Sequence, residues 1–243
     1  MAKAYRAYAF DLYGTLVDIR TDEEASSLWK KTALLLGFFG LSIAPGDLKM
    51  AYRRLCRERT EKMEKALARK KIPGPCEIDI VQVWQTLFRE NGLPLSRTQA
   101  MEICRFFRAQ SIRRLRLFPE VMTLLQSLRA RKKEIYLLTN AQASFTRPEL
   151  TLLGLDRAFD RIYISSEYGV KKPSSAFFGL LQQNGVSPGE CLMVGNDQLC
   201  DCEGASSAGM DSLYIFTPQS PPPPAILPDR CRQIGCLLEV LDA

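Results

Sequence analysis

Histidine is the residue that this sequence lacks: none occurs among its 243 residues. Without histidine, the chain cannot form a Ser-His-Asp triad, a Cys-His pair, or a zinc or haem site with a histidine ligand. It also lacks the side chain that ordinarily titrates near neutral pH. Any catalysis must therefore use carboxylates, lysine, serine, threonine, tyrosine or cysteine.

The eight cysteines do not have the spacing of a metal or redox site. No two of them form a CxxC pair, which argues against a zinc ribbon and a thioredoxin-type dithiol. Most lie among apolar residues, as buried free thiols do. The sequence also has no long uninterrupted apolar run, and its first residues do not match a signal peptide. We therefore expect a cytoplasmic protein with reduced thiols and no membrane segment.

Charge is unevenly distributed along the chain. The net charge is +6, yet residues 45–116 alone contain 17 Lys and Arg against 8 Asp and Glu. This basic segment indicates either a subdomain with its own task or ordinary solvated helix faces. A basic surface alone gives only nonspecific, salt-dependent affinity for nucleic acid, and no recognised nucleic-acid motif accompanies it. Nucleic acid is therefore not an expected partner.

Two kinds of pattern divide the chain. Residues 5–10 form an apolar run that predicts a buried strand ending at a glycine turn. From about residue 20 to residue 116 the apolar spacing is helical, and no strand is expected there. Within this stretch, Ser96 and Gln99 form a capping box that begins a helix predicted to run toward Arg116.

After residue 117, short apolar strands alternate with helices, one of which should begin near Pro148. This alternation predicts a parallel sheet with both faces covered. The fold class is therefore α/β: a doubly wound, Rossmann-like core interrupted by an all-helical cap. The core takes residues 1–18 and 117–243, and the cap takes residues 19–116. The proline-rich stretch 217–228 is interpreted as a rigid surface connection before a short terminal helix.

Polar residues follow several predicted strands, where doubly wound sheets bind their ligands. Asp11 opens the first glycine turn, so its carboxylate should lie at the edge of the sheet. Thr139 and Asn140 are short hydrogen-bonding residues at another strand end. Asp197 and Asp201 lie four residues apart where a helix begins, a spacing that suits a Mg²⁺ site, the orientation of a lysine, or helix capping.

Four segments, in this order, resemble the motifs of the haloacid dehalogenase superfamily. They are Asp11 to Asp18, Thr139-Asn140, Gly169 to Pro173, and Val194-Gly195-Asn196-Asp197 through Asp201 and on to Met210. Each is weak alone, but the four together cover the whole chain and lie at the expected strand ends. The resemblance implies this superfamily's core with a helical cap inserted after the first strand.

The resemblance also implies roles for individual residues. Asp11 would be the nucleophile of a covalent mechanism, forming an ester or acyl phosphate that water hydrolyses. Lys172, directly before the proline, would neutralise charge on the transferred group. Thr15, Thr139 and Asn140 would hold the oxygens of that group. Mg²⁺ would be held by residues taken from Asp11, Tyr13, Asn196, Asp197 and Asp201. For Asp201, a structural or lysine-orienting role is an equal alternative.

Two positions depart from the phosphatase pattern of this superfamily. Tyr13 occupies the place of a second aspartate that acts as general acid and base, and it matches the 2-haloacid dehalogenase branch. Asn196 occupies the place of an acidic Mg²⁺ ligand, with Asp197 displaced by one residue. An asparagine oxygen can bind Mg²⁺, but it brings no charge.

Three functions therefore compete. The first, which we favour, is a Mg²⁺-dependent phosphatase that acts on a small anionic metabolite through an aspartyl phosphate. The second is a metal-independent hydrolase of the 2-haloacid dehalogenase type, supported by Tyr13. The third is a non-catalytic binding module on the same fold. The joint presence of Asp11, Thr139, Lys172 and Asp201 argues against this third function.

Overall fold

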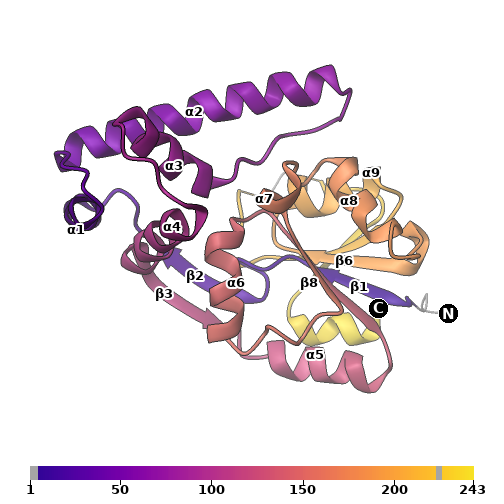
Figure 1. Ribbon diagram of the computed structural model, residues 1–243. Helices are drawn as coiled ribbons and strands as arrows, with labels where there is room; N and C mark the ends of the chain where they lie inside the picture. Colours follow the sequence, from indigo (N-terminus) through magenta and orange to yellow (C-terminus); the bar gives the residue numbers. More distant parts are fainter. Residues whose placement is uncertain (1–4, 223–225) are drawn as a thin grey trace.

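The computed structural model describes residues 5–222 and 226–243. Its main sheet has six parallel strands in the order β5-β4-β1-β6-β7-β8 (Figure 1). The strands are β1 (Ala7–Phe10), β4 (Glu134–Thr139), β5 (Arg161–Ile164), β6 (Cys191–Gly195), β7 (Asp211–Ile215) and β8 (Cys231–Ile234). The α/β class predicted from the sequence is confirmed.

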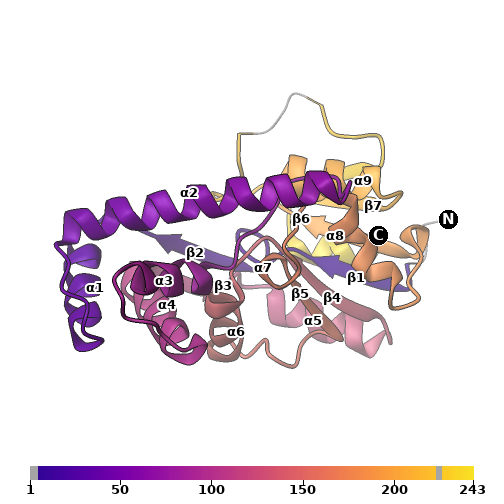
Figure 2. The same ribbon diagram turned by 45° about the horizontal axis from the view of Figure 1, so that its top comes forward.

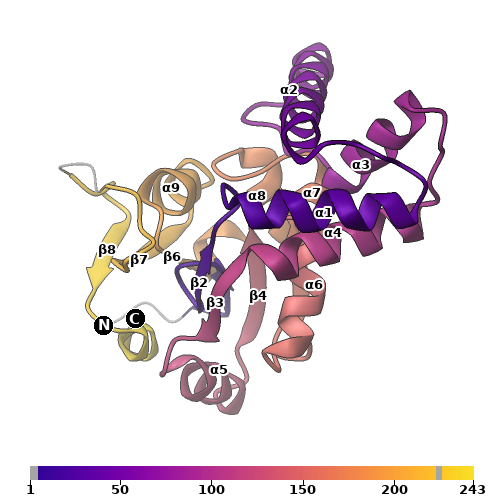
Figure 3. The same cartoon turned by 90° about the vertical axis from the view of Figure 1, so that its left-hand side faces the viewer.

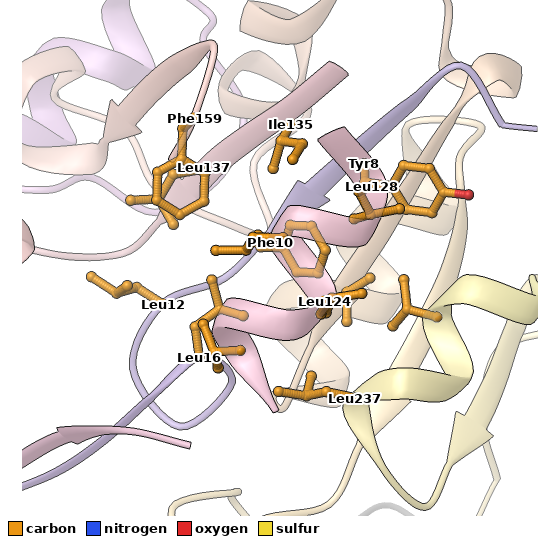
Figure 4. Packing of buried hydrophobic residues seen from close by; sticks show 14 of the residues in the cluster. Tyr8, Phe10, Leu12, Leu16, Leu124, Leu128, Ile135, Leu137, Phe159 and Leu237 are labelled. Carbon is orange, nitrogen blue, oxygen red and sulfur yellow. The ribbon is translucent and has the colours of Figure 1, made fainter. Parts of the chain in front are cut away.

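Side chains of β1 alternate between two hydrophobic clusters, one on each face of the sheet. Tyr8 and Phe10 pack into the first cluster, under α5 (Val121–Ala130) and the terminal 3₁₀ helix η3 (Leu237–Asp242) (Figure 4). Ala7 and Ala9 face the second cluster, with helix α8 (Ser175–Gln182). Because alternate residues of a strand point to opposite faces, a fully apolar strand is buried on both sides.

The helices between β2 and β3 gather around a hydrophobic cluster of their own. They are α1 (Ser26–Phe38), α2 (Pro45–Arg69), α3 (Ile80–Glu90) and α4 (Arg97–Ser111), which we call the helical unit. Trp29, Tyr52, Trp84 and Phe107 pack edge to face, tilted or stacked at its centre. The far end of α2 reaches past α3 and α4 toward α7 and α8 (Figures 1 and 2).

A two-stranded ribbon joins the helical unit to the main sheet (Figure 3). It pairs β2 (Val17–Thr21) antiparallel to β3 (Ile112–Leu117). Two predictions are therefore wrong: strands do occur between residues 20 and 116, and the helix opened by Ser96 ends at Ser111. In β3, Leu115 and Leu117 pack against the core at the two-residue spacing of a strand. Pairing with β2 thus overrides the helix propensity of this segment.

The remaining elements refine the predicted alternation. Helix α6 (Ala143–Leu152) begins five residues before its expected start at Pro148, which lies inside the helix. Strand β8, unpredicted because Cys231–Ile234 is polar and short, adds an edge beside β7. The short helical segments are α7 (Ser165–Tyr168), η1 (Pro188–Glu190), the π-helical η2 (Gln198–Glu203) and α9 (Gly204–Ser207).

Two further sequence-based predictions concern membrane-spanning helices and the proline-rich stretch. In the described ranges, no helix has the length and apolarity needed to span a membrane. The proline-rich stretch 217–228 is described only in part, because residues 223–225 lie outside the described residues. The short helix expected after it is present as η3.

Candidate active site

A cavity of about 180 Å³ lies at the carboxyl ends of β1, β4 and β6. Eight of the nine residues singled out from the sequence line it, and Thr15, the ninth, hydrogen-bonds to two of them. Cys200, Gln219 and Pro221 complete the lining. The eight are Asp11, Tyr13, Thr139, Asn140, Lys172, Asn196, Asp197 and Asp201. The structure thus brings the four sequence motifs together at one place.

Asp11 is fixed by the strand before it and the turn after it. Its backbone N–H donates to the Val194 carbonyl at 2.9 Å, which extends the pairing of β1 with β6. In the turn, Gly14 has φ +86°, and a Cβ there would lie 2.3 Å from Nδ2 of Asn196. Only glycine therefore permits the turn to approach the fourth motif so closely.

Lys172 forms two buried ion pairs at the centre of the site. Its Nζ donates to Oδ1 of Asp11 at 2.7 Å and to Oδ1 of Asp201 at 2.6 Å. The side chains of Lys172 and Asp201 are each only 1% exposed. Burial alone would lower the pKa of Lys172, but the two carboxylates outweigh it and raise this pKa above its usual value. Lys172 therefore stays charged beside the predicted nucleophile.

Both carboxylate oxygens of Asp201 are used within the protein. Oδ1 binds Lys172, and Oδ2 accepts the backbone N–H of Asp197 at 3.0 Å. A Cβ on Gly195 would lie 2.1 Å from that Oδ2, so the strand end leaves room only for glycine. Of the two roles considered for Asp201, these contacts favour orientation of Lys172 over direct metal ligation.

Asn140 and Thr139 differ in how their side chains are used. Oδ1 of Asn140 accepts the backbone N–H of Lys172 at 2.8 Å, and its Nδ2 donates to the Lys172 carbonyl at 3.0 Å. Asn140 therefore positions Lys172, and the second hydrogen of its Nδ2 remains for the ligand oxygen that the sequence analysis expected it to hold. The buried hydroxyl of Thr139 has no hydrogen-bond partner among the described residues. A ligand oxygen would satisfy it.

Replacing Lys172 by methionine is expected to destabilise the fold by about 3–5 kcal/mol, because two buried carboxylates would lose their shared cation. Urea unfolding followed by circular dichroism measures this loss. Lys171→Met is the matched control: Lys171 is 3.9 Å from Glu77 and its side chain is 36% exposed. Its loss should stay below about 1 kcal/mol. Equal losses in the two variants would contradict the structural role of Lys172.

The hydroxyl of Tyr13 is held by residues that the sequence analysis did not identify. It donates to the Glu149 carboxylate of α6 and lies 3.0 Å from the Thr146 hydroxyl. Arg108 of α4 binds Glu149 at 2.6 Å, and its guanidinium lies 5.5 Å from the centre of the Tyr13 ring. Burial and the Glu149 charge raise the pKa of Tyr13. No motif marks Arg108 or Glu149, since only the packing of α4 on α6 brings them together.

Oxygen atoms suited to a hard cation meet beside Thr15. Its hydroxyl lies 3.3 Å from Oδ2 of Asp11 and 3.2 Å from Oδ1 of Asn196. One hydroxyl hydrogen cannot serve both acceptors, so the two oxygens keep spare capacity for a ligand. Residues 5–222 and 226–243 contain no metal-binding group of three or more Asp, Glu, Cys or His. Mg²⁺ needs only one or two carboxylates because it retains several waters, so Asp11 with Asn196 fits it.

Each of the two other candidate metal ligands uses one side-chain oxygen in a contact within the protein. The Asp197 carboxylate caps η2 by accepting the backbone N–H of Cys200 at 2.9 Å, which is the capping role considered from the sequence. The Tyr13 hydroxyl donates to Glu149. Asp11 and Asn196 are thus the side chains whose contacts best match a metal site.

The beginning of the proline-rich stretch is part of the site and not merely a surface connection. Thr217 donates from its hydroxyl to the Gly14 carbonyl at 2.8 Å. Gln219 donates to Oδ1 of Asp18 at 2.6 Å, and both Gln219 and Pro221 line the cavity. Composition alone gave no sign of these contacts, because they join positions about 200 residues apart.

Comparisons with known proteins agree with this geometry. The family model for haloacid dehalogenase-like hydrolases matches residues 5–209. Phosphoserine phosphatase from Thermus thermophilus is 32% identical over 189 residues, which cover 73% of this chain and 72% of that protein. Phosphoglycolate phosphatase from Yersinia pestis is 29% identical over 215 residues, covering 88% and 82%. The structure of 2-haloacid dehalogenase from Pseudomonas syringae shares the fold, with a TM-score of 0.66, 19% identity, and coverage of 98% and 97%.

Proposed function

Because this chain belongs to the haloacid dehalogenase-like hydrolases, we propose that it is a Mg²⁺-dependent phosphatase of small phosphorylated metabolites that works through an aspartyl phosphate. The two curated relatives described above are phosphatases and match more than two thirds of this chain. The alternative is the metal-independent dehalogenase reaction, which Tyr13 supports.

The charge of the cavity is the observation that favours the phosphatase. Asp11, Asp197 and Asp201 bring three carboxylates, and Lys172 is the one cation among the described lining residues. A phosphate dianion or the carboxylate of a 2-haloacid would be repelled by this surplus of negative charge. A divalent cation on Asp11 and Asn196 removes the repulsion, whereas a metal-independent reaction leaves it in place.

The side chains divide the work of the proposed reaction. Asp11, whose Oδ1 accepts from Lys172, attacks phosphorus with its carboxylate. As the new P–O bond forms, the P–O bond to the leaving group breaks, and the released alcohol takes its proton from solvent. The hydroxyl of Thr139 donates to a phosphoryl oxygen, and Asn140 keeps Lys172 in place. Water then hydrolyses the aspartyl phosphate. Mg²⁺, when bound, would neutralise charge on the transferred phosphoryl group.

A panel of phosphate esters and 2-haloacids, assayed with and without a chelator, tests this function. We expect phosphate release that stops when the chelator is added and returns with Mg²⁺. Halide release from the 2-haloacids, unaffected by the chelator, would establish the dehalogenase reaction instead.

The affinity for Mg²⁺ is expected to be low, because Asn196 contributes an uncharged oxygen. Asn196→Asp should lower the Mg²⁺ concentration for half-maximal activity roughly tenfold, since ligand charge tunes the affinity of hard cations. Titration of activity with Mg²⁺ measures the change. Gln183→Glu adds the same charge at an exposed site outside the cavity and should leave the titration unchanged. An unchanged titration in Asn196→Asp would exclude Asn196 as a ligand.

The division into a core and a cap is part of the same proposal. Residues 19–116 would close over the cavity and exclude water during the reaction. The basic surplus of residues 45–116 should then attract anionic substrates from a distance. We expect kcat/KM for an anionic ester to fall as salt rises from 0.01 to about 0.15 M, where the Debye length shortens from about 30 to 8 Å. If kcat/KM did not change with salt, this charge would contribute only to solubility.

A further inference from the structure

Five residues that line the cavity have no role in the proposed reaction. Asp11, Thr139, Asn140, Lys172, Asn196 and Asp201 hold the nucleophile, the metal and the phosphoryl group. The rest of the lining is Tyr13, Asp197, Cys200, Gln219 and Pro221, which we call the leaving-group wall. Because a phosphate ester extends beyond its phosphoryl group, we expect the part of the leaving group nearest to phosphorus to lie against this wall.

The charged member of the leaving-group wall is a carboxylate, Asp197. One of its oxygens accepts the Cys200 N–H, and its side chain is half-buried. Tyr13, Gln219 and Pro221 add no charge beside it. An anionic leaving group would therefore meet a carboxylate at close range, where like charges repel most strongly.

Cations near the leaving-group wall are already paired with carboxylates. Arg108, beside Tyr13, binds Glu149 at 2.6 Å, and both side chains are nearly buried. Behind Gln219, Asp18 binds Arg114 at 2.8 Å and Arg116 at 3.0 Å. Lys172 is shared between Asp11 and Asp201. Arg108 and Lys172 cannot leave their partners for a ligand without leaving a buried carboxylate uncompensated, which is costly. Arg114 and Arg116 share Asp18, and neither of them lines the cavity.

We propose that the enzyme selects phosphate esters whose leaving group carries hydroxyl or ammonium groups, and discriminates against leaving groups that carry a carboxylate. This inference rests on the proposed phosphatase function. An ammonium group gains attraction from Asp197, and hydroxyl groups find hydrogen-bonding partners in Asp197 and Gln219. A carboxylate on the leaving group would lose its hydration on binding and would be repelled by Asp197.

Three two-carbon phosphate esters of similar size separate these cases: 2-hydroxyethyl phosphate, phosphoethanolamine and 2-phosphoglycolate. Each is tested as a competitive inhibitor of aryl phosphate hydrolysis, at saturating Mg²⁺ and fixed ionic strength. Inhibition constants are chosen because they report binding even when the ester itself is hydrolysed slowly. We expect the constant for 2-phosphoglycolate to be at least about tenfold higher than the other two. Equal constants, or tighter binding of 2-phosphoglycolate, would overturn the proposal.

The same assay distinguishes a failure of this inference from a failure of the proposed phosphatase function. If the aryl phosphate is not hydrolysed with Mg²⁺, the phosphatase proposal fails and the selectivity falls with it. If the aryl phosphate is hydrolysed but 2-phosphoglycolate binds best, only the selectivity is wrong. The basic helical unit would by itself favour the most negative ester, so the expected order cannot result from long-range attraction.

A charge-reversal experiment locates the selectivity at the leaving-group wall. Pro221 is exposed at the rim of the cavity, so Pro221→Arg places a cation there. The ratio of the inhibition constants of 2-phosphoglycolate and 2-hydroxyethyl phosphate should fall about fivefold. Gln183→Arg, at an exposed position outside the cavity, is the matched control and should leave this ratio unchanged. If both variants leave it unchanged, the wall does not set the preference.

Discussion

Asp11→Asn is expected to lower kcat by about 10⁴-fold or more while the protein stays folded. The carboxamide has the size of the carboxylate but is not a nucleophile. The backbone contact of residue 11 with Val194 does not depend on the side chain. Lys172 keeps its ion pair with Asp201 at 2.6 Å, so the buried cation remains compensated.

Steady-state hydrolysis of an aryl phosphate measures the loss, and thermal unfolding followed by circular dichroism checks the fold. Beryllofluoride, which mimics the phosphoryl group of an aspartyl phosphate, should bind the wild type and not the variant. Asp47→Asn makes the same change at an exposed position in the first turn of α2 and should retain full activity. Full activity in Asp11→Asn would refute covalent catalysis by Asp11.

A steep dependence on the leaving group is the second large effect that we expect. The Tyr13 hydroxyl donates to Glu149, and the raised pKa of this phenol makes it a worse proton donor than free tyrosine. General acid and base catalysis contributes about 10²–10⁴-fold. Aryl and acyl phosphates, whose leaving groups need no proton, should therefore react faster than simple alkyl phosphates by a factor in this range.

Two substitutions at one position test the cause of that dependence. A plot of log kcat against the pKa of the leaving group should have a steep negative slope in the wild type. Tyr13→Asp should flatten the slope by supplying a proton donor, while Tyr13→Phe should keep it. If Tyr13→Phe selectively lost activity toward alkyl phosphates, the phenol would be the proton donor. A flat slope in the wild type would mean that some other group donates the proton.

Three residues at the centre of the site could be predicted from the sequence because each ends or directly follows an apolar strand. Parallel strands end at one edge of a sheet, so Asp11, Thr139 and Asn196 had to converge there. Lys172 and Asp201 came from the motifs, and their ion pair is the lysine-orienting alternative considered for Asp201. Local pattern was sufficient wherever a residue is placed by its own strand.

The surroundings of the site could not be predicted in the same way. Glu149 and Arg108 meet Tyr13 only because α6 packs against α4, and neither position has a local signature. Gln219 reaches Asp18 across about 200 residues of sequence. Segment 112–117 contains Arg and Leu, both good helix formers, and its strand exists only because β2 lies beside it. In each case the deciding contact is made by a distant part of the chain.

The chain passes between the core and the helical unit twice, once in β2 and once in β3. Because these two strands are paired, they should move together as one ribbon. Two independent tethers would let the helical unit slide and twist over the cavity. Paired strands resist stretching and sliding past each other, and they bend most easily perpendicular to the plane of the ribbon. The closure proposed above should therefore bend this ribbon, and it must also change the contacts of Cys76 and Glu77 with Val170 and Gly169. Because Gln219 binds Asp18 in β2, the rim of the cavity is attached to that ribbon.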